Sequence, residues 1–346
     1  MTLGPLMIDL EGTVLQPEER ELLAHPSVGS VILFARNYAE PEQLTRLVAD
    51  IHAVRSPALI VGVDHEGGRV QRFRAGFSKL PPLRRIGHEH DADPQAGAAL
   101  ARELGWLMAA ELRAHGVDLS FAPCVDLDYG VSEVIGDRAL HADPAVVAAL
   151  AVAYQAGMRS AGMAATAKHF PGHGAVVADS HHALPVDRRR LVDLDADIAP
   201  YRLLIANGLA GVMVAHVLYP EVDAVPASAS ARWIRGILRD ELRFQGVVFA
   251  DDLSMVGAAA VGGIVERAER ALAAGCDVLP VCNHRPSAIA VIEGLKAAPD
   301  PVAALRRVRL RSRLQQDIEA LQASERWRMA QQALERCSAP PDLRLA

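Results

Sequence analysis

The stretch Gly246-Val-Val-Phe-Ala-Asp251 carries the pattern that decides the fold of this chain. Its apolar residues follow one another without alternating polar ones, as in a strand that is buried on both faces of a parallel sheet. The run ends in a carboxylate, and a segment with helical periodicity, Val261–Ala274, follows it. A strand that leads into a helix in this way is the repeating unit of α/β proteins.

Further runs of the same kind occur along the rest of the chain. The predicted strands are Pro5–Asp9, Ser30–Phe34, Ala58–Asp64, Asp118–Pro123, Met163–Lys168, Gly211–His216, Gly246–Asp251 and Asp277–Cys282. The helical patterns between them include Glu40–Arg55, Pro94–Ala114, Pro144–Ser160, Ala199–Asn207, Ala231–Glu241 and Val261–Ala274. Eight strand-helix units over about 280 residues predict a single (β/α)8 barrel of the TIM type. The alternative, a doubly wound open sheet, is disfavoured because no glycine-rich dinucleotide fingerprint follows the first strand.

Polar residues gather at the carboxyl ends of the predicted strands, where barrel enzymes build their active sites. These residues are Asp9, Glu11, Arg36, Asn37, Asp64, Asp126, Asp128, Lys168, His169, His216, Asp251, Asp252, Asn283 and His284. In a closed barrel they converge on one mouth, whereas an open sheet would spread them along an edge. Their placement therefore favours the barrel and predicts a site at its C-terminal mouth.

Composition narrows the class of ligand. The formal net charge is -6 and the isoelectric point is near 6.1, which disfavours broad attraction to nucleic acid or to anionic membranes. We therefore expect a small-molecule ligand, with no nucleic-acid or membrane partner. The four scattered cysteines match no common zinc spacing, so we expect buried free thiols, no metal and no cofactor.

The ends of the chain suggest its location and domain organisation. No basic segment precedes the first apolar run, and Asp9 and Glu11 interrupt that run, so no export signal is predicted. No segment is long and apolar enough to cross a bilayer. We expect a cytoplasmic monomer whose residues 1–346 form one catalytic TIM-barrel domain, with about residues 286–346 as a helical C-terminal cover.

The densest chemistry lies in Lys168-His-Phe-Pro-Gly-His-Gly174 and the nearby Asp179-Ser-His-His182. Glycine, proline and polar side chains in such a short segment are typical of a functional loop. A carboxylate two residues from an imidazole, as in Asp179-x-His181, can fix the tautomer of the ring and favour its charged form. Such a histidine can donate a proton in one step and accept one in the next. The alternative is a surface turn with solvated histidines.

The adjacent pair Asp251-Asp252 offers a carboxylate to the barrel mouth. Neighbouring side chains of an extended strand point to opposite sides, so at most one of the two faces the mouth squarely. The other is expected to cap a helix or to accept hydrogen bonds behind the site. A carboxylate at this place can act as a nucleophile, a general base, a metal ligand or a helix cap.

Four further residues are suited to a polyhydroxylated ligand, because sugar hydroxyls donate and accept hydrogen bonds at once. Asp64 supplies an acceptor, and Arg72, Lys168 and His169 supply donors. Each charge taken alone is equally compatible with an ordinary salt bridge.

Taken together, these residues resemble family 3 of the glycoside hydrolases, and within it the single-domain β-N-acetylhexosaminidases of the NagZ type. The matching motifs occur in order along most of the chain: Ile8–Gly12, Gly29–Asn37, Asp64–Phe73, Val134–Arg138, Lys168–Gly174, Asp179–His181 and Asp251–Met255. The lysine-to-glycine motif with its downstream Asp-Ser-His is the most specific of them.

The resemblance implies a TIM-type barrel without a second sandwich domain. It also implies cleavage of terminal β-linked N-acetylglucosamine from the 1,6-anhydro-muropeptide disaccharide in peptidoglycan recycling. By position, Asp251 is expected to be the nucleophile and His181 the acid/base, with Asp179 as the partner of His181. The implied sugar-binding residues are Asp64, Arg72, Arg138, Lys168 and His169. The expected reaction is double displacement with retention through a covalent glycosyl-enzyme.

Several alternatives stay open. The substrate's acetamido group could replace Asp251 as nucleophile, and phosphate could replace water as the acceptor, giving a phosphorylase. A non-catalytic sugar-binding barrel is a further reading. A metal-dependent barrel hydrolase would use ligands from His169, His173, His181, His216 and Asp251.

The chain departs from the family pattern at position 65, where histidine stands in place of the more frequent glutamine. His65 flanks Asp64 without replacing it. We therefore expect a change in the hydrogen bonds behind the site and no loss of function.

Overall fold

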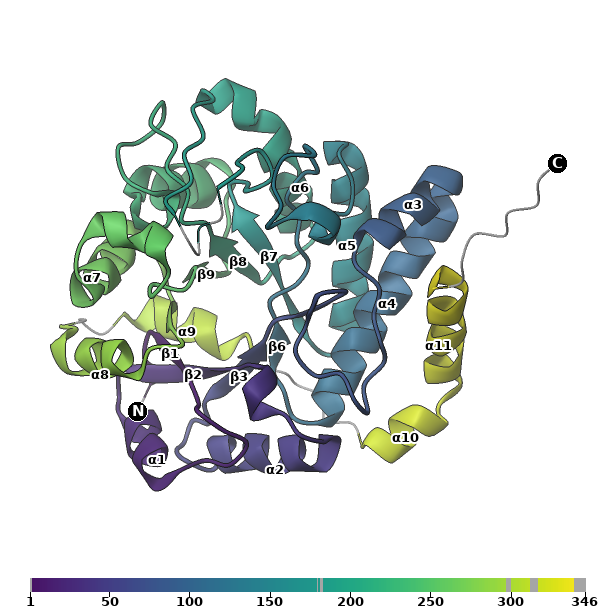
Figure 1. Cartoon of the computed structure of the whole chain (residues 1–346), viewed down its shortest axis with the longest axis horizontal. Helices are drawn as coiled ribbons and strands as arrows, with labels where there is room; N and C mark the ends of the chain where they lie inside the picture. Colours follow the sequence, from purple (N-terminus) through teal and green to yellow (C-terminus); the bar gives the residue numbers. More distant parts are fainter. Residues whose placement is uncertain (1, 179, 181–182, 297–299, 312–316, 339–346) are drawn as a thin grey trace.

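Eight parallel strands form a nearly closed barrel in the computed structural model, and helices surround it (Figure 1). The structure describes residues 2–178, 180, 183–296, 300–311 and 317–338. The barrel strands are β1 (Leu6–Asp9), β2 (Val28–Leu33), β3 (Ile60–Val63), β6 (Leu119–Ser120), β7 (Ala164–Phe170), β8 (Gly211–Val214), β9 (Val247–Ala250) and β10 (Leu279–Val281). They pair in the order β10-β1-β2-β3-β6-β7-β8-β9, and each corresponds to a predicted strand. The predicted barrel is confirmed.

The barrel closes where β9 meets β10. Phe249 and Val278 form a parallel bridge, and the backbone N–H of Ala250 donates to the carbonyl of Val278 at 3.0 Å. The ring of Phe249 also meets the ring of Phe121 edge to face, with centroids 5.2 Å apart. Because β7 and β8 separate their strands in the sheet, this contact crosses the barrel interior. The interior is therefore packed by side chains, as in other barrels of this type.

Helices follow the strands in the expected alternation. They are α1 (Pro17–Ala24), α2 (Pro41–His52), α3 (Arg84–Ala92), α4 (Pro94–Ala114), α5 (Pro144–Ser160), α6 (Asp195–Ala206), the π-helix η5 (Arg232–Glu241), α7 (Ile264–Ala274), α8 (Arg285–Gly294), α9 (Pro301–Val308), α10 (Ile318–Ala323) and α11 (Glu325–Ser338). The short 3-10 helices are η1 (Ala35–Asn37), η2 (Gly136–Arg138), η3 (Leu191–Leu194), η4 (Ala227–Ala229) and η6 (Val256–Val261). The predicted bounds of α4 and α5 are confirmed.

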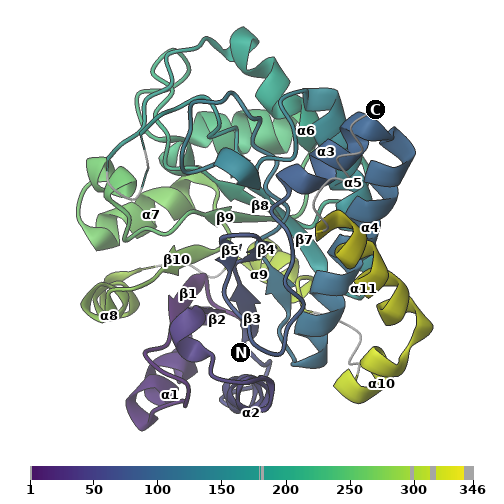
Figure 2. The same cartoon turned by 45° about the vertical axis from the view of Figure 1, so that its right-hand side comes forward.

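Two details differ from the sequence prediction. Helix α6 begins at Asp195 instead of Ala199, because Asp195 and Asp197 occupy its first turn, where the helix dipole favours negative charge. The segment after Asp64 forms an antiparallel hairpin of β4 (His65–Gly67) and β5 (Val70–Gln71) at the carboxyl end of β3 (Figure 2). Gly67 and Gly68, with φ of 111° and 56°, make its turn, a conformation that glycine adopts at little cost.

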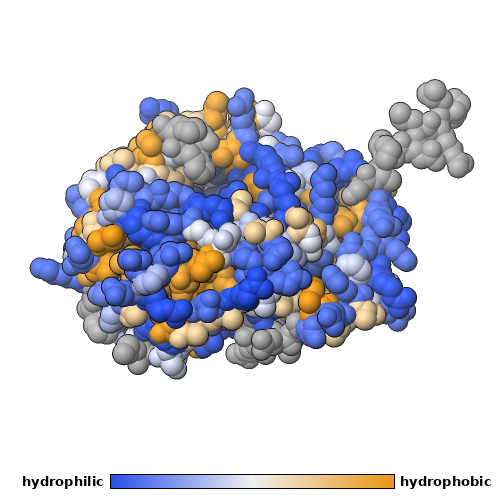
Figure 3. Space-filling model, turned by 60° about the horizontal axis from the view of Figure 1, so that its bottom comes forward, coloured by the Kyte–Doolittle hydropathy of each residue, from blue (hydrophilic) through white to orange (hydrophobic). Residues whose placement is uncertain are grey.

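The last two helices, α10 and α11, lie along the outside of α4 (Figures 1 and 2). The guanidinium of Arg326 stacks over the ring of Trp106 at 4.3 Å. The indole N–H of Trp327 donates to Glu111 at 3.3 Å. Figure 3 shows a mainly hydrophilic face with hydrophobic residues in patches between the polar ones. Among the described residues, no helix has the length and hydropathy needed to span a membrane.

The amino end of the β9-β10 seam depends on the buried carboxylate of Asp277. It accepts hydrogen bonds from Arg239 at 2.7 Å, Arg306 at 3.2 Å and the backbone N–H of Val248 at 2.8 Å. Replacing it by Asn leaves two cations without their counter-charge. We predict that Asp277→Asn lowers the free energy of unfolding by about 3 kcal/mol in urea titrations, as expected when one partner of a buried ion pair is removed.

The matched control is Asp195→Asn, because Asp195 pairs with Arg202 at the surface, where the two side chains are 65% and 47% exposed. Exposed pairs contribute less than about 1 kcal/mol. Equal losses in the two variants would contradict the role given to Asp277.

Candidate active site

The candidate site is a cavity of about 280 Å³ at the C-terminal mouth of the barrel. Its walls come from the ends of β2, β3, β7, β8, β9 and β10, together with the β4-β5 hairpin and the loop before η2. The lining residues are Ile32, Phe34, Asp64, Glu66, Arg69, Val70, Arg72, Val134, Arg138, Lys168, His169, Met213, Asp251, Asp252, Met255, Pro280, Cys282 and Asn283. The structure therefore brings together six of the residues predicted from the sequence: Asp64, Arg72, Arg138, Lys168, His169 and Asp251.

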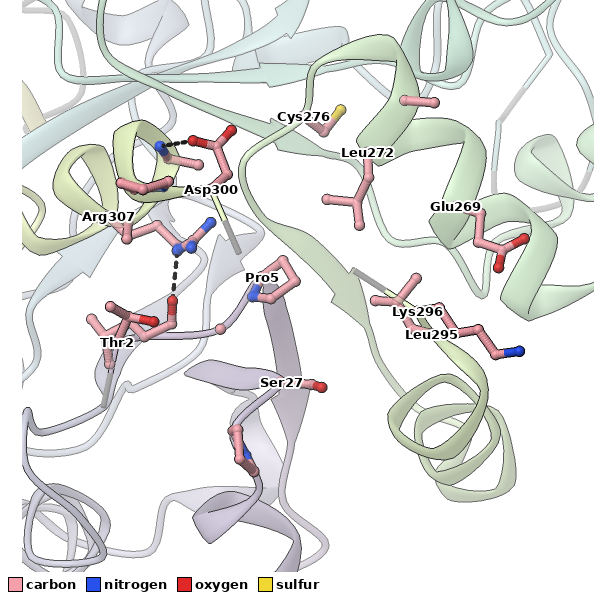
Figure 4. Close-up of a pocket in the computed structure, with 17 residues that line it drawn as sticks. Thr2, Pro5, Ser27, Glu269, Leu272, Cys276, Leu295, Lys296, Asp300 and Arg307 are labelled. Carbon is pink, nitrogen blue, oxygen red and sulfur yellow. Dashed lines mark hydrogen bonds between the residues drawn. The ribbon is translucent and has the colours of Figure 1, made fainter. Parts of the chain in front are cut away.

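A larger cavity of about 670 Å³ lies at the opposite end of the barrel, beside the start of β1 (Figure 4). Two of its charged residues, Arg307 and Asp300, hold the fold together. Arg307 donates to the carbonyls of Leu3 and Asp277, and Asp300 caps α9 through the N–H groups of Val302 and Ala303. Because conserved chemistry in barrel enzymes is built at the other end, size alone does not make this cavity the active site.

A buried cluster of charges forms one wall of the site. Lys168 Nζ lies 2.7 Å from Asp64 and 2.6 Å from Glu66. Arg138 donates two hydrogen bonds of 2.9 Å to the two oxygens of Glu66. Arg72 approaches Asp64 at 3.5 Å. Two carboxylates and three cations are thus paired with one another at the wall of the cavity. The cavity is large enough for one sugar ring.

The cluster keeps its members charged. Burial alone would raise the pKa values of Asp64 and Glu66, but the neighbouring cations hold both pKa values below their usual range. Burial would also lower the pKa of Lys168, yet Asp64 and Glu66 raise it. At neutral pH the wall therefore presents fixed charges, and such a wall can orient hydroxyl groups without reorganising.

A second buried carboxylate, Asp126, holds the segment that carries His169. Its oxygens accept from the ring Nδ1 of His169 at 2.7 Å, from the backbone N–H of His169 at 3.2 Å and from the backbone N–H of His173 at 2.7 Å. The thiol of Cys124 also donates to it, at 3.3 Å. Asp126 does not line the cavity, so it acts through the residues that it holds.

The two adjacent aspartates at the end of β9 have different surroundings. Asp252 accepts from the backbone N–H and the hydroxyl of Ser254, at 3.0 and 2.7 Å, and from the N–H of Cys282 at 3.0 Å. It therefore fixes the turn that follows β9. Asp251 lines the cavity, and one of its oxygens accepts from the N–H of Asp252 at 2.8 Å. Both aspartates line the cavity, but three hydrogen bonds assign Asp252 to the turn, so Asp251 is the better candidate for the roles considered from the sequence.

His65 points away from the cavity. Side chains alternate along the β4 hairpin strand, so Asp64 and Glu66 line the cavity while the ring of His65 packs beside Phe73 and Phe77, at 5.7 and 5.6 Å between centroids. Burial, with the charges of Arg72 and Arg74, lowers the pKa of His65 to about 3. The ring is therefore neutral at physiological pH.

The predicted acid/base His181 and its partner Asp179 lie outside the described residues. Ser180, between them in sequence, is described and buried. Its carbonyl accepts from the N–H of Gly257 at 2.9 Å, and its hydroxyl lies 3.2 Å from Nε2 of His173.

Glu66 and Asp126 belong to the site, yet the sequence alone assigns neither of them a role. The spacing in the sequence could have identified Glu66, because it lies two residues beyond Asp64 and side chains two apart in a strand lie on the same face. For Asp126 the sequence gives only its place after a strand, and its partners, His169 on β7 and His173 in the loop after it, become visible only in the folded barrel.

The metal-dependent alternative gains no support from the geometry. Both ring nitrogens of His216 are occupied, by the hydroxyl of Ser228 at 2.7 Å and the carbonyl of Asp252 at 2.9 Å. Within the described parts of the chain, the group whose ligand atoms come within 4.8 Å of one another is Cys124, Asp126 and His169. In this group Asp126 already bonds to both Cys124 and His169. Of the predicted ligands, His169, His173, His216 and Asp251 do not form such a group, and His181 lies outside the described residues.

Comparison with known proteins identifies the family. Residues 7–310 match the glycosyl hydrolase family 3 N-terminal domain. The beta-hexosaminidase of Thioalkalivibrio sulfidiphilus is 55% identical over 330 residues, which is 95% of each chain. That of Thiobacillus denitrificans is 59% identical over 285 residues, covering 82% of this chain and 79% of its own.

A solved structure agrees with these relatives. The crystal structure of NagZ from Neisseria gonorrhoeae in complex with N-trifluoroacetyl-D-glucosamine superposes with a TM-score of 0.93 and 42% identity, covering 98% of this chain and 99% of that one. The chain therefore belongs to glycosyl hydrolase family 3. The predicted class of enzyme, a glycoside hydrolase, is confirmed.

Asp252 gives the site a predictable dependence of stability on pH. Burial, together with the negative charge of Asp251, raises the pKa of Asp252 to about 6 despite its three hydrogen bonds. Between about pH 4 and 6 the folded protein thus keeps a proton that the unfolded chain has released, so stability falls as pH rises through this interval. We predict that Asp252→Asn abolishes this decline, which should amount to about 3 kcal/mol over the interval, as measured by urea unfolding at half-unit pH steps. An unchanged slope in the variant would contradict the prediction.

The position of His65 gives a second prediction. His65→Gln should change kcat/KM on an aryl β-N-acetylglucosaminide by less than about threefold relative to the unmutated enzyme, which corresponds to less than 1 kcal/mol. The reason is that the ring packs beside Phe73 and Phe77 and does not line the cavity. A hundredfold change in turnover would show that His65 acts on the site.

Proposed function

We propose that this chain is a retaining exo-β-N-acetylglucosaminidase. Its substrate is GlcNAc-1,6-anhydroMurNAc, with or without attached peptide, from which it releases terminal β-linked N-acetylglucosamine during cytoplasmic cell-wall recycling. The similarity to relatives named beta-hexosaminidase, and to a NagZ crystallised with an N-acylglucosamine, supports this assignment. We further propose that residues 1–346 act as one catalytic domain and as a monomer.

The observation that carries the proposal is the buried charged wall of the cavity with Asp251 at its edge. Asp64, Lys168, Arg138 and His169 offer acceptors and donors in fixed positions, which suits sugar hydroxyls that do both. A cavity of about 280 Å³ is at the lower end of the range for ligand sites, which favours a single terminal sugar over a longer chain.

The proposed reaction has two steps. In the first, a carboxylate oxygen of Asp251 forms a bond to the anomeric carbon while the glycosidic bond breaks, and His181 gives its proton to the departing oxygen. In the second, His181 takes a proton from water, whose oxygen bonds to the anomeric carbon as the ester to Asp251 breaks. Asp179 favours the protonated form of His181 in the first step.

The mechanism is tested by trapping the ester. A 2-deoxy-2-fluoro glycoside with a good leaving group should label Asp251, as read by peptide mass spectrometry, because fluorine at C2 slows the second step more than the first. Asp251→Asn should lower kcat on p-nitrophenyl β-N-acetylglucosaminide by at least about 1,000-fold, as for the loss of a nucleophile. The matched control is Asp252→Asn, which makes the same change at the neighbouring carboxylate that holds the turn. It should lower kcat much less than Asp251→Asn does.

The alternatives give different results in the same assays. Absence of a label with full turnover would favour attack by the acetamido group. Faster turnover with phosphate, and a sugar phosphate as product, would identify a phosphorylase. Loss of activity after exhaustive chelation would support metal-dependent hydrolysis.

A further inference from the structure

The ring of His169 is held in one orientation from behind the cavity. Asp126 Oδ2 lies 2.7 Å from Nδ1 of this ring, and both groups are buried. Neighbouring His169 and His173, with their N–H donors, outweigh burial and keep the pKa of Asp126 below its usual range. An ionised carboxylate only accepts hydrogen bonds, so Nδ1 of His169 carries a proton.

The other ring nitrogen, Nε2, lies on the side of the cavity. Its neighbour there is Nη2 of Arg138, at 3.5 Å, which is a cationic donor. A proton on Nε2 would face this donor, whereas a lone pair is compatible with it. The surroundings thus favour the Nδ1–H tautomer, in which Nε2 accepts.

Around Nε2 the described wall is rich in donors. Arg138 and Lys168 supply N–H groups, and their own carboxylate partners, Glu66 and Asp64, are engaged with them. A sugar hydroxyl placed here can accept from a cation and donate its proton to Nε2 of His169. A group that only accepts would meet the lone pair of Nε2 instead.

We propose that Asp126 is a positioning residue that fixes His169 as the Nδ1–H tautomer, so that its Nε2 selects a substrate group able to donate a hydrogen bond. The proposal rests on the proposed function, since it assigns the hydroxyl to the amino sugar. It explains why a carboxylate that does not line the cavity accepts from three N–H groups of His169 and His173, in the segment that carries His169 to the cavity.

The substitution Asp126→Asn tests this tautomer directly. Oδ1 of Asp126 accepts from the backbone N–H of His173 at 2.7 Å, whereas the backbone N–H of His169 is shared between the two oxygens at 3.3 and 3.2 Å. The amide oxygen of Asn should therefore take the place of Oδ1. The amide NH2 then takes the place of Oδ2 and donates to Nδ1 of His169. The ring must move its proton to Nε2, which becomes a donor toward the cavity.

The control is Asp118→Asn. Asp118 is also a buried carboxylate beside a strand, accepting from the N–H of Val61 at 2.9 Å and pairing with His52 at 3.1 Å. It precedes β6, whereas Asp126 follows it, so the two stand at opposite ends of the barrel. Asp118→Asn therefore also removes a buried carboxylate that pairs with a histidine, but it does so at the end of the barrel away from the site.

The probes are p-nitrophenyl β-N-acetylglucosaminides in which fluorine replaces the hydroxyl at C3, C4 or C6, because C–F accepts weakly and does not donate. Asp126→Asn should lower kcat/KM of the parent glycoside by about 10- to 100-fold, as when the partner that orients a histidine is removed. For each analogue we divide kcat/KM of the parent glycoside by kcat/KM of the fluoro analogue. For one of the three analogues, this ratio should be about fivefold or more smaller in Asp126→Asn than in the unmutated enzyme, which is equivalent to about 1 kcal/mol. In Asp118→Asn all three ratios should stay as in the unmutated enzyme.

Equal ratios in Asp126→Asn and the unmutated enzyme would overturn the proposal, because a general loosening of the site lowers both rates alike. No hydrolysis of the parent glycoside by the unmutated enzyme would instead refute the proposed function. Long-range 1H–15N spectra of the histidines in the unmutated protein give a readout that does not require the variant to fold. The signal that disappears in His169→Gln should show protonated Nδ1 and unprotonated Nε2, and the reverse pattern would refute the tautomer.

Discussion

The rest of the site depends on the mutual pairing of buried charges around Glu66. Its two oxygens bind Arg138, and one of them also binds Lys168, which in turn binds Asp64. Transferring each ion from water costs several kcal/mol, and at an effective dielectric constant of 20 two charges 4 Å apart recover only about 4 kcal/mol. Such a cluster adds little to stability compared with apolar packing, so its place at the wall of a cavity is best explained by ligand binding.

The barrel makes this pairing possible by joining distant segments. Asp64 and Glu66 follow β3, Lys168 and His169 end β7, and Arg138 reaches the same cavity from the long connection after β6. Asp126 then ties the end of β7 to the strand before it. Since parallel strands all end at the same mouth, charges that follow β3, end β7 or lie in the connection after β6 meet there and are paired by one another's side chains.

Much of this arrangement could be predicted from the sequence, because it depends on local patterns. Unbroken apolar runs identified the strands, and the polar residues that end them identified the mouth, including Asp64, Lys168 and Asp251. Glu66 was missed although it lies two residues beyond Asp64, because its partners Arg138 and Lys168 come from distant parts of the chain. The role of Asp126 was missed because its partners lie 43 and 47 residues away. His216 lies two residues beyond the end of β8 and not at its end as predicted, and its contacts with Ser228 and Asp252 place it in a supporting position that no spacing reveals.

The place where the sugar binds tests the proposed site most directly. A crystal structure with N-acetylglucosamine should show one sugar in the cavity of about 280 Å³, with its hydroxyls on Asp64, Lys168, Arg138 and His169 and its anomeric carbon beside Asp251. A sugar bound in the larger cavity below the barrel, with the charged wall unchanged and empty, would contradict it.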